Sequence, residues 1–233
     1  MPSSPERRAA AIVVAGGAGT RLGGEVRKQY LHLAGVPVLL RALGAFVYHP
    51  GIAQVVAVLP AEDAADPPPW LPELGVTIAA GGAERGDSVW NGLACVRADV
   101  ECVLIHDGAR PLVTRGVIDR VLAASRDGGA IAAVPVTDTI KSVDADGRVT
   151  GTPDRAALWQ AQTPQGFPRE RLMEAYRRAR EEGVAATDDA AVYERYGGVV
   201  RVVAGAADNL KVTRPGDLEV AEALLRLQVA RTT

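Results

Sequence analysis

Short apolar runs alternate along the chain with stretches in which apolar residues recur at helical spacing. The runs at 10–15 and 52–59 have the length and the apolar character of strands that are buried on both faces of a sheet. The pattern predicts strands at 10–15, 52–59, 76–80, 102–105, 130–136 and 199–204, and helices at 37–48, 89–96, 117–125, 169–180, 190–196 and 216–229. Because strands and helices alternate, the sequence predicts an α/β, Rossmann-like, doubly wound fold with a mostly parallel sheet and helices on both faces.

Three stretches interrupt this alternation. Residues 61–74 are rich in proline, which predicts a surface loop and a broken helix, and residues 163–168 are predicted to be irregular. Residues 137–159 contain an alternating segment, the turn Asp144-Ala145-Asp146-Gly147 and a short return strand, which together predict a β-hairpin. The pattern alone favours a hairpin folded back on its own domain over a projecting arm that packs on a second subunit. Both interpretations stay open at this point.

A glycine-rich stretch directly follows the first predicted strand. It reads Ala15-Gly16-Gly17-Ala18-Gly19-Thr20-Arg21, and further cations follow at Arg27 and Lys28. Glycines leave backbone N–H groups uncovered, and such groups beside fixed cations suit a polyphosphate. The stretch is not a P-loop because it lacks Gly-Lys-Ser/Thr, and it matches the dinucleotide fingerprint only in part, since Leu22 stands at the third glycine position. We predict a phosphate site here, with an ordinary strand-to-helix connection and solvated charges as the alternative.

The predicted topology brings two other polar stretches to the same edge of the sheet. In open α/β sheets, ligands bind beyond the carboxyl ends of the strands. Residues 16–28, 81–88 and 107–110 each follow a predicted strand. We therefore expect these three stretches to form one rim and the ligand site.

Composition narrows the functional classes. With 233 residues, of which 48% are hydrophobic, the chain can bury a sizeable core, and we expect a single domain over 1–233. The net charge of -2 argues against nucleic acid as the main partner. Cys95 and Cys102 lie in apolar runs and are predicted to be core thiols in a reducing compartment. No run is apolar enough to span a membrane and residues 1–8 contain no apolar signal region, so we expect a cytoplasmic protein.

Lysine is rare in this chain. Only three of the 26 basic residues are lysines, namely Lys28, Lys141 and Lys211, and each lies beside a motif-like stretch. Arginine evidently serves wherever a generic positive charge is needed. A lysine is expected where a compact ammonium is required that a guanidinium fork cannot replace, although chance also explains so small a number.

Taken together, the motifs resemble one family, the 2-C-methyl-D-erythritol 4-phosphate cytidylyltransferases of the non-mevalonate isoprenoid pathway. The resemblance covers roughly residues 11–225 and includes the motif His106-Asp107-Gly108-Ala109-Arg110-Pro111. The matching segments are 15–21, 28–30, 81–82, 84–85, 88–89, 106–111, 138–141, 163–165, 187–188 and 208–213. Each segment is a weak signal alone, but their shared order makes the match specific.

This resemblance implies an enzyme, a nucleotidyltransferase that moves a cytidylyl group from CTP to 2-C-methyl-D-erythritol 4-phosphate. The products would be 4-diphosphocytidyl-2-C-methyl-D-erythritol and pyrophosphate. Such a reaction needs positioning and charge neutralisation more than covalent help from the protein. A glycine-rich stretch that ends in cations agrees with that need.

The resemblance also assigns roles to residues. Arg21 and Lys28 would stabilise charge in the transition state, and Arg155 and Lys211 would hold the methylerythritol phosphate, so these four are the expected catalytic residues. The expected nucleotide-binding residues are Ala15, Gly16, Gly17, Gly19, Gly82, Ser88, Asp107 and Gly108. The expected substrate-binding residues are Arg110, Thr139, Arg155, Thr163 and Lys211. Asp107 would also bind a divalent cation, Mg²⁺, because a hard cation prefers carboxylate and phosphate oxygens.

The family's arm swaps within a homodimer, so the resemblance implies that Arg155 and Thr139 serve the neighbouring active site.

Three positions depart from the family pattern. Arg27 replaces a usual proline, which adds a cation and is expected to loosen the loop. Ala83 replaces an acidic residue that is often found after the paired glycines, and Gly108 replaces an alanine.

Two other functions stay open. A related cytidylyltransferase would act on ribitol 5-phosphate or another sugar or alditol phosphate, and product formation with each phosphate separates the two. A non-catalytic regulator of the same fold would bind CTP without releasing pyrophosphate. No catalytic histidine is predicted, because His32, His49 and His106 lack metal-ligand spacing, and His106 is interpreted as a structural residue beside Asp107.

Overall fold

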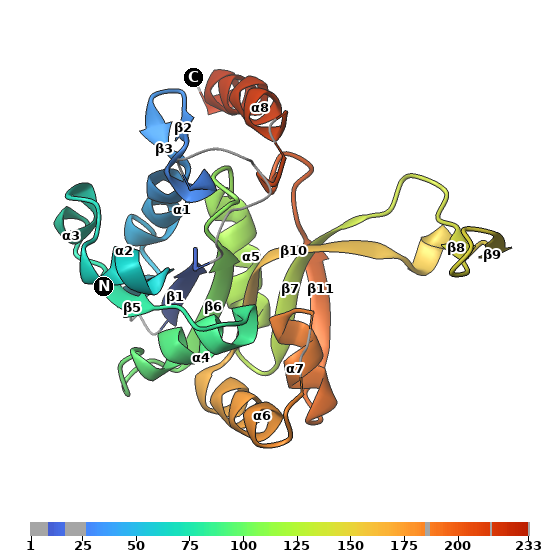
Figure 1. The fold of residues 1–233 in the computed structure, drawn as a ribbon, viewed down its shortest axis with the longest axis horizontal. Coiled ribbons are helices and arrows are strands. Elements are labelled where there is room, and N and C mark those ends of the chain that lie inside the picture. The colour runs from blue at the N-terminus through green and yellow to red at the C-terminus, as the bar shows by residue number, and fades with distance from the viewer. Residues whose placement is uncertain (1–8, 17–26, 185–186, 215, 233) are drawn as a thin grey trace, which may run out of the picture.

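A seven-stranded sheet forms the centre of the computed structural model, which describes residues 9–16, 27–184, 187–214 and 216–232 (Figure 1). The strands lie in the order β11-β7-β10-β6-β1-β4-β5. They are β1 (Ala9–Val14), β4 (Ile52–Leu59), β5 (Thr77–Ala80), β6 (Cys102–Asp107), β7 (Gly129–Pro135), β10 (Trp159–Pro168) and β11 (Val200–Ala204). The longer helices are α1 (Val38–Val47), α4 (Arg85–Ala94), α5 (Arg115–Ala124), α6 (Arg169–Glu181), α7 (Asp189–Arg195) and α8 (Asp217–Thr232). The shorter elements are η2 (Lys28–Tyr30), β2 (His32–Leu33), β3 (Val36–Pro37), α2 (Ala61–Ala65), α3 (Trp70–Glu73), β8 (Ser142–Val143), β9 (Val149–Gly151) and η3 (Arg155–Ala157).

The sheet is mostly parallel. Strand β1 pairs in parallel with β4 and β6, β4 pairs in parallel with β5, and β7 pairs in parallel with β11. Only β10, among the strands of this sheet in the described residues, runs antiparallel to its neighbours, β6 and β7. The carboxyl ends of β1, β5 and β6 therefore lie at one edge, as the topological rule requires.

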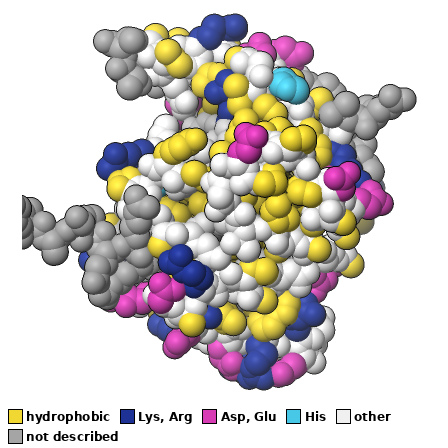
Figure 2. Space-filling view, turned by 90° about the vertical axis from the view of Figure 1, so that its left-hand side faces the viewer, with side chains coloured by type: hydrophobic (Ala, Val, Ile, Leu, Met, Phe, Trp, Pro, Cys, Tyr) yellow, Lys and Arg dark blue, Asp and Glu magenta, His cyan; other side chains and the backbone are white. Residues whose placement is uncertain are grey.

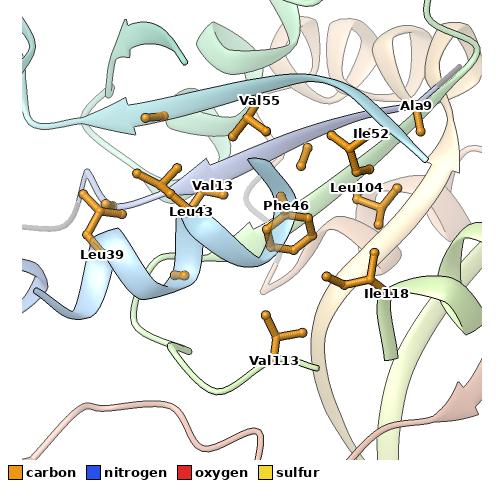
Figure 3. Packing of buried hydrophobic residues seen from close by; sticks show 14 of the residues in the cluster. Ala9, Val13, Leu39, Leu43, Phe46, Ile52, Val55, Leu104, Val113 and Ile118 are labelled. Carbon is orange, nitrogen blue, oxygen red and sulfur yellow. The ribbon is translucent and has the colours of Figure 1, made fainter. Parts of the chain in front are cut away.

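Alternate residues of β1 supply the two halves of the core. Ala9, Ala11 and Val13 pack in a cluster with α1 and α5, whose members Leu43, Phe46 and Ile118 are shown in Figure 3. Ala10 and Ile12 pack in a second cluster with side chains of α4, α6 and α7. A strand that is apolar on both faces needs helices on both faces, and the predicted fold class is confirmed.

The prediction of irregular structure at residues 163–168 is wrong. These residues form the second half of β10, where Gln165 lies opposite Ile105 and Phe167 lies opposite Val103 of β6. The register against β7 shifts between Ala161 and Gln165, which accommodates the proline at 164. Pairing with strands on both sides satisfies the backbone groups of a segment whose local sequence does not look like a strand.

The start of α4 also differs from the prediction. The helix predicted at 89–96 begins earlier, at Arg85, with Glu84 as its N-cap. The Asp87 carboxylate, in the first turn, accepts a hydrogen bond from the backbone N–H of Glu84 at 3.3 Å. This capping-box arrangement starts the helix one turn earlier and places Ser88 inside it, buried.

Residues 137–159 project from the body as a β-hairpin arm (Figure 1). The two-stranded sheet of β8 and β9 forms its tip, and Val143 and Val149 there are 58% and 60% exposed. The hairpin thus projects from its own domain, although the sequence pattern alone favoured a hairpin folded back on it.

The described helices and surface show two further features. None of the helices in the described part of the chain has both the length and the apolar character needed to cross a bilayer. On the face shown in Figure 2, basic and acidic side chains are interspersed with hydrophobic ones, and neither sign of charge forms a continuous patch.

Candidate functional site

An open pocket of about 180 Å³ lies at the carboxyl ends of β1, β5 and β6. It is lined by Val14, Ala15, Gly16, Gln29, Gly82, Ala83, Glu84, Arg85, Ser88, Asp107, Gly108, Ala109 and Lys211. The pocket brings together seven of the predicted site residues, which are Ala15, Gly16, Gly82, Ser88, Asp107, Gly108 and Lys211. Gly17, Gly19 and Arg21 lie outside the described residues, as does the side chain of Lys28, whose backbone belongs to η2.

Glycines and one hydroxyl build the wall of the pocket at the start of α4. The Ser88 Oγ accepts a hydrogen bond from the backbone N–H of Gly82 at 3.1 Å and donates to the carbonyl of Glu84 at 3.2 Å. A Cβ at Gly82 would lie 2.2 Å from the Asp87 Cβ, so no side chain fits there. A Cβ at Gly16 would lie 3.2 Å from the Ser88 Oγ. The wall is therefore largely backbone, held in place by hydrogen bonds such as the one from Gly82 to Ser88.

Gly108 is packed closely enough to explain its departure from alanine. A Cβ at this position would lie 3.0 Å from the Ala15 Cβ and 3.0 Å from the Leu39 Cδ1. Such distances are tighter than most side-chain contacts allow, so an alanine would require its neighbours to move.

The charge of the pocket centres on Asp107, at the end of β6. Lys211 Nζ lies 2.9 Å from Asp107 Oδ2, Arg110 Nε lies 3.5 Å from the same oxygen, and Arg85 Nη2 lies 3.7 Å from Oδ1. Burial opposes ionisation of this carboxyl, but the charges of Lys211 and Arg85 outweigh it and lower the pKa of Asp107 to about 2. The pocket thus holds an ionised carboxylate within reach of three cations.

A buried network fixes Asp107 from behind. The Thr163 Oγ1 accepts a hydrogen bond from the backbone N–H of Asp107 at 3.0 Å and lies 3.0 Å from His106 Nδ1. His106 Nε2 lies 3.1 Å from the carbonyl of Arg110, which can only accept, so Nε2 carries the proton and Nδ1 accepts from Thr163. Complete burial lowers the pKa of His106 to about 4 and keeps the ring neutral. Thr163 therefore supports Asp107 in this structure and does not line the pocket.

Arg110 and the predicted arm residues lie away from the pocket wall. Arg110 Nη1 donates to the carbonyl of Asn209 at 2.7 Å, which ties the end of β6 to the segment that carries Lys211. Arg155, at the start of η3, donates from Nη1 to the carbonyl of Thr137 at 2.9 Å. Both Arg155 and Thr139 belong to the exposed arm, so the chain does not bring them to its own pocket.

The added cation Arg27 is paired. Its Nη2 lies 2.6 Å from Glu62 Oε2 and its Nη1 lies 2.9 Å from Asp63 Oδ2, both on α2. The Tyr30 hydroxyl also donates to Asp63 at 2.7 Å. Two carboxylates balance the extra charge, and the guanidinium ties residue 27 to the body. The expected loosening concerns the preceding residues, 17–26, which lie outside the described part of the chain.

Residue patterns missed Arg85, Gln29 and Glu84 as lining residues. Arg85 and Glu84 were part of a matching motif without an assigned role, and Gln29 follows Lys28 directly. The available signal was the position of 84–85 just after a predicted strand, at the edge where ligands bind.

A pocket with a backbone wall, an ionised carboxylate and clustered cations, at the carboxyl edge of a parallel sheet, is typical of α/β enzymes that bind nucleotides. The description "IspD: 2-C-methyl-D-erythritol 4-phosphate cytidylyltransferase" belongs to the family model that matches residues 9–227. The chain belongs to this family of nucleotidyltransferases, and the resemblance inferred from the motifs is confirmed.

Relatives match over most of their length. A protein from Syntrophus aciditrophicus, named 2-C-methyl-D-erythritol 4-phosphate cytidylyltransferase, is 45% identical over 228 residues, which is 95% of this chain and 97% of that protein. The crystal structure of the enzyme of that name from Thermus thermophilus has a TM-score of 0.79 and 35% identity, and the match covers 92% of this chain and 98% of that one. The 4-diphosphocytidyl-2C-methyl-D-erythritol synthase of Anaerococcus prevotii has a TM-score of 0.82 and 27% identity, and the match covers 94% and 96% of the two chains.

Proposed function

We propose that this chain transfers the cytidylyl group of CTP to 2-C-methyl-D-erythritol 4-phosphate. An oxygen of the 4-phosphate attacks the α-phosphorus of CTP, the bond from that phosphorus to the bridging oxygen breaks, and pyrophosphate leaves. The observation that carries this proposal is the pocket itself, in which Asp107, Lys211 and Arg85 lie beside a wall of glycine backbone. Family membership specifies the two substrates.

The pocket residues divide between the two substrates. The backbone around Ala15 and Gly16, continuing through Gly17 and Gly19, binds the nucleotide phosphates. Gly82 and Ser88 border the cytosine, where backbone groups read a pyrimidine edge and the narrow wall excludes a purine. Lys211 holds the methylerythritol phosphate, and Arg110 supports this side of the pocket from behind through Asp107.

Arg21 and Lys28 neutralise the charge that develops on the α-phosphate and the leaving pyrophosphate. Phosphoryl transfer gains most from positioned cations, because the transition state spreads negative charge over its oxygens. What supports these two roles is the sequence: Arg21 ends the glycine-rich stretch that follows β1, and Lys28 precedes Gln29, which lines the pocket.

The donor set of the pocket fits a magnesium ion that is held mainly by substrate. No group of three or more His, Cys, Asp or Glu side chains in the described residues is placed to hold a metal. Mg²⁺ often needs only one or two carboxylates together with substrate phosphates, and Asp107 is ionised and faces the pocket. Bound there, the ion would neutralise phosphate charge, and Asp107 is the residue that would hold it.

We infer that residues 1–233 act as one nucleotidyltransferase domain and that the arm at 137–159 completes a homodimer. Arg155 and Thr139 lie on the arm, apart from the pocket of their own chain, and they are expected to enter the pocket of a second copy. The cytoplasm suits this chemistry, because both substrates are charged metabolites and Cys95 and Cys102 are free thiols.

A pyrophosphate-release assay with CTP, Mg²⁺ and 2-C-methyl-D-erythritol 4-phosphate tests the function. We expect turnover with this pair, little turnover when ribitol 5-phosphate replaces the methylerythritol phosphate, and a strong loss of turnover in Lys28→Ala with unchanged thermal unfolding. Tight CTP binding without pyrophosphate release, or faster release with ribitol 5-phosphate, would overturn the proposal.

A further inference from the structure

Arg85 lines the pocket beside Asp107, but the proposed mechanism gives it no task. It is the first residue of α4, and its side chain lines the pocket and is 31% exposed. Its guanidinium is placed between two carboxylates from distant parts of the chain, Asp189 of α7 and Asp107 of β6. Arg85 therefore connects Asp189 with Asp107.

The contact of Arg85 with Asp189 is a bidentate ion pair. Arg85 Nη1 donates to Asp189 Oδ1 at 3.0 Å, and Arg85 Nη2 donates to Asp189 Oδ2 at 2.7 Å. The Asp189 side chain is 0% exposed, so the pair is shielded from solvent on the carboxylate side. A bidentate pair fixes both the position and the plane of the guanidinium.

Tyr176 of α6 holds the carboxylate in turn. Its hydroxyl donates to Asp189 Oδ1 at 2.6 Å, and the ring is buried. Burial and the nearby Asp189 charge raise the pKa of Tyr176 well above its usual value, so the hydroxyl stays protonated and remains a donor. Asp189 therefore has its two oxygens occupied by donors from two different helices.

The other end of the connection reaches the pocket. Arg85 Nη2 lies 3.7 Å from Asp107 Oδ1, while Lys211 and Arg110 face the opposite oxygen, Oδ2, at 2.9 Å and 3.5 Å. Each oxygen of Asp107 thus has its own cation, which defines the rotation of the carboxylate about its Cβ–Cγ bond. Without Arg85, Oδ1 would lose its cation and the carboxylate could turn toward Lys211.

We propose that Tyr176, Asp189 and Arg85 form a positioning relay that sets the orientation of Asp107 toward the nucleotide. The relay connects the α6–α7 layer with the carboxyl end of β6 through a single guanidinium. Arg85 is a positioning residue, since it acts through Asp107. The inference rests on the proposed function, which supplies the role of Asp107.

A merely structural role makes a different prediction. If Arg85 only pinned α4 to α7, its replacement would weaken the fold and would lower activity by the same factor whether or not Asp107 was intact. A positioning role requires that the effect disappear once Asp107 has been changed, because two groups that act as a unit are not additive.

The test is a double-mutant cycle between Arg85→Lys and Asp107→Asn, measured with excess enzyme so that slow variants remain quantifiable. Lysine keeps the charge but has one nitrogen and cannot serve both carboxylates. We expect Arg85→Lys to lower kcat/KM for CTP by about 10- to 30-fold in the wild-type background, mainly through kcat, and by less than about twofold with Asp107→Asn. Tyr176→Phe should lower it by about two- to threefold, again only when Asp107 is present.

Arg177→Lys is the matched control. Arg177 also makes short pairs with two carboxylates, Glu174 and Glu181, but on the exposed face of α6, and its activity should equal that of the wild type. Asp189→Asn is not used in the cycle, because it buries an amide in place of a charge and could prevent folding. Arg85 is partly exposed, and thermal unfolding of Arg85→Lys shows whether the cycle is measured on folded protein.

Equal loss from Arg85→Lys in both backgrounds, or no loss in either, overturns the relay. The same cycle is measured on the dissociation constant for CTP with Mg²⁺ by calorimetry, where coupling between the two substitutions is again expected. A wild-type protein without turnover would contradict the proposed function. The double-mutant cycle on CTP binding would still test the relay in that case.

Discussion

The pocket and the arm are built in opposite ways. Around Asp107, the supporting side chains are closed off from solvent, with His106 at 0% exposure and Thr163 at 5%. On and beside the arm, apolar side chains face solvent, including Val143, Val149 and, at the start of β10, Trp159 at 46%. One chain therefore holds the pocket residues of the proposed site against its own core, whereas the arm residues Arg155 and Thr139 lie apart from that pocket.

This difference matches the proposed division between groups that one chain holds in place and groups that a second copy would supply. A buried network holds Asp107 without any ligand, because every polar partner comes from the same domain. A two-stranded hairpin is marginal alone, and its exposed apolar side chains are best explained by a surface that covers them.

The largest effect should come from removing the arm cation in one variant and the pocket cation in another. Arg155→Ala on the arm and Lys211→Ala in the pocket should each lower kcat/KM by about 10²- to 10³-fold, because each removes a cation from the phosphate site. Mixing the two variants under conditions that exchange subunits should restore about a quarter of the wild-type rate, since half of the dimers are mixed and one of their two sites is intact. The rate of pyrophosphate release measures the rescue.

A mixture that stays as slow as its components would contradict the exchange of arms between subunits. The control is a mixture of Arg155→Ala with a variant that carries both substitutions, in which no intact site can form.

The next effect concerns the buried side of the comparison and is a loss of stability in acid. The folded protein keeps His106 neutral with a pKa near 4, whereas the unfolded chain binds a proton near the ordinary value of 6.5. The contribution is therefore full above pH 6.5 and is lost as the pH falls toward 4. We expect the free energy of unfolding to fall by about 2 kcal/mol between pH 7 and pH 5, as measured by urea titration.

His106→Gln should make this slope shallower. His49 contributes with the same sign, because burial lowers its pKa as well, so His49→Gln is measured in parallel. Asp107 acts in a different window, since its stabilisation is present above its ordinary pKa and is lost only as the pH approaches about 2. A slope that His106→Gln leaves unchanged would show that the ring does not titrate as its burial requires.

The smallest effect should come from Arg27, which ties the end of the glycine-rich stretch to α2. Its partner Glu62 is 84% exposed and the Arg27 side chain is 30% exposed, so water screens much of the attraction. Arg27→Pro should cost less than about 1 kcal/mol of unfolding free energy. Glu62→Gln should cost still less, because Asp63 stays in place, and a larger loss in either variant would mean that this pair is more than a surface contact.

Local pattern was sufficient for elements whose type and ends are marked by their own residues. The apolar run at 52–59 became β4 with the predicted bounds. The helix predicted at 190–196 formed as α7, where Asp188 accepts a 2.9 Å hydrogen bond from the backbone N–H of Ala191, a common role of aspartate at an N-cap. The rule for parallel sheets also predicted that residues 16, 82, 88, 107 and 108 meet at one edge, where they line the same pocket.

Apolar spacing and glycine content were enough to predict the layers of the fold and the edge of the sheet where the pocket lies, because both signals act over a few residues. Only the tertiary structure decided that residues 163–168 join the sheet, that Thr163 stands behind Asp107, and that Arg85 meets Asp189 from 104 positions away. Those outcomes depend on strand pairing and on charges brought together by packing, and no local pattern records which distant groups will meet.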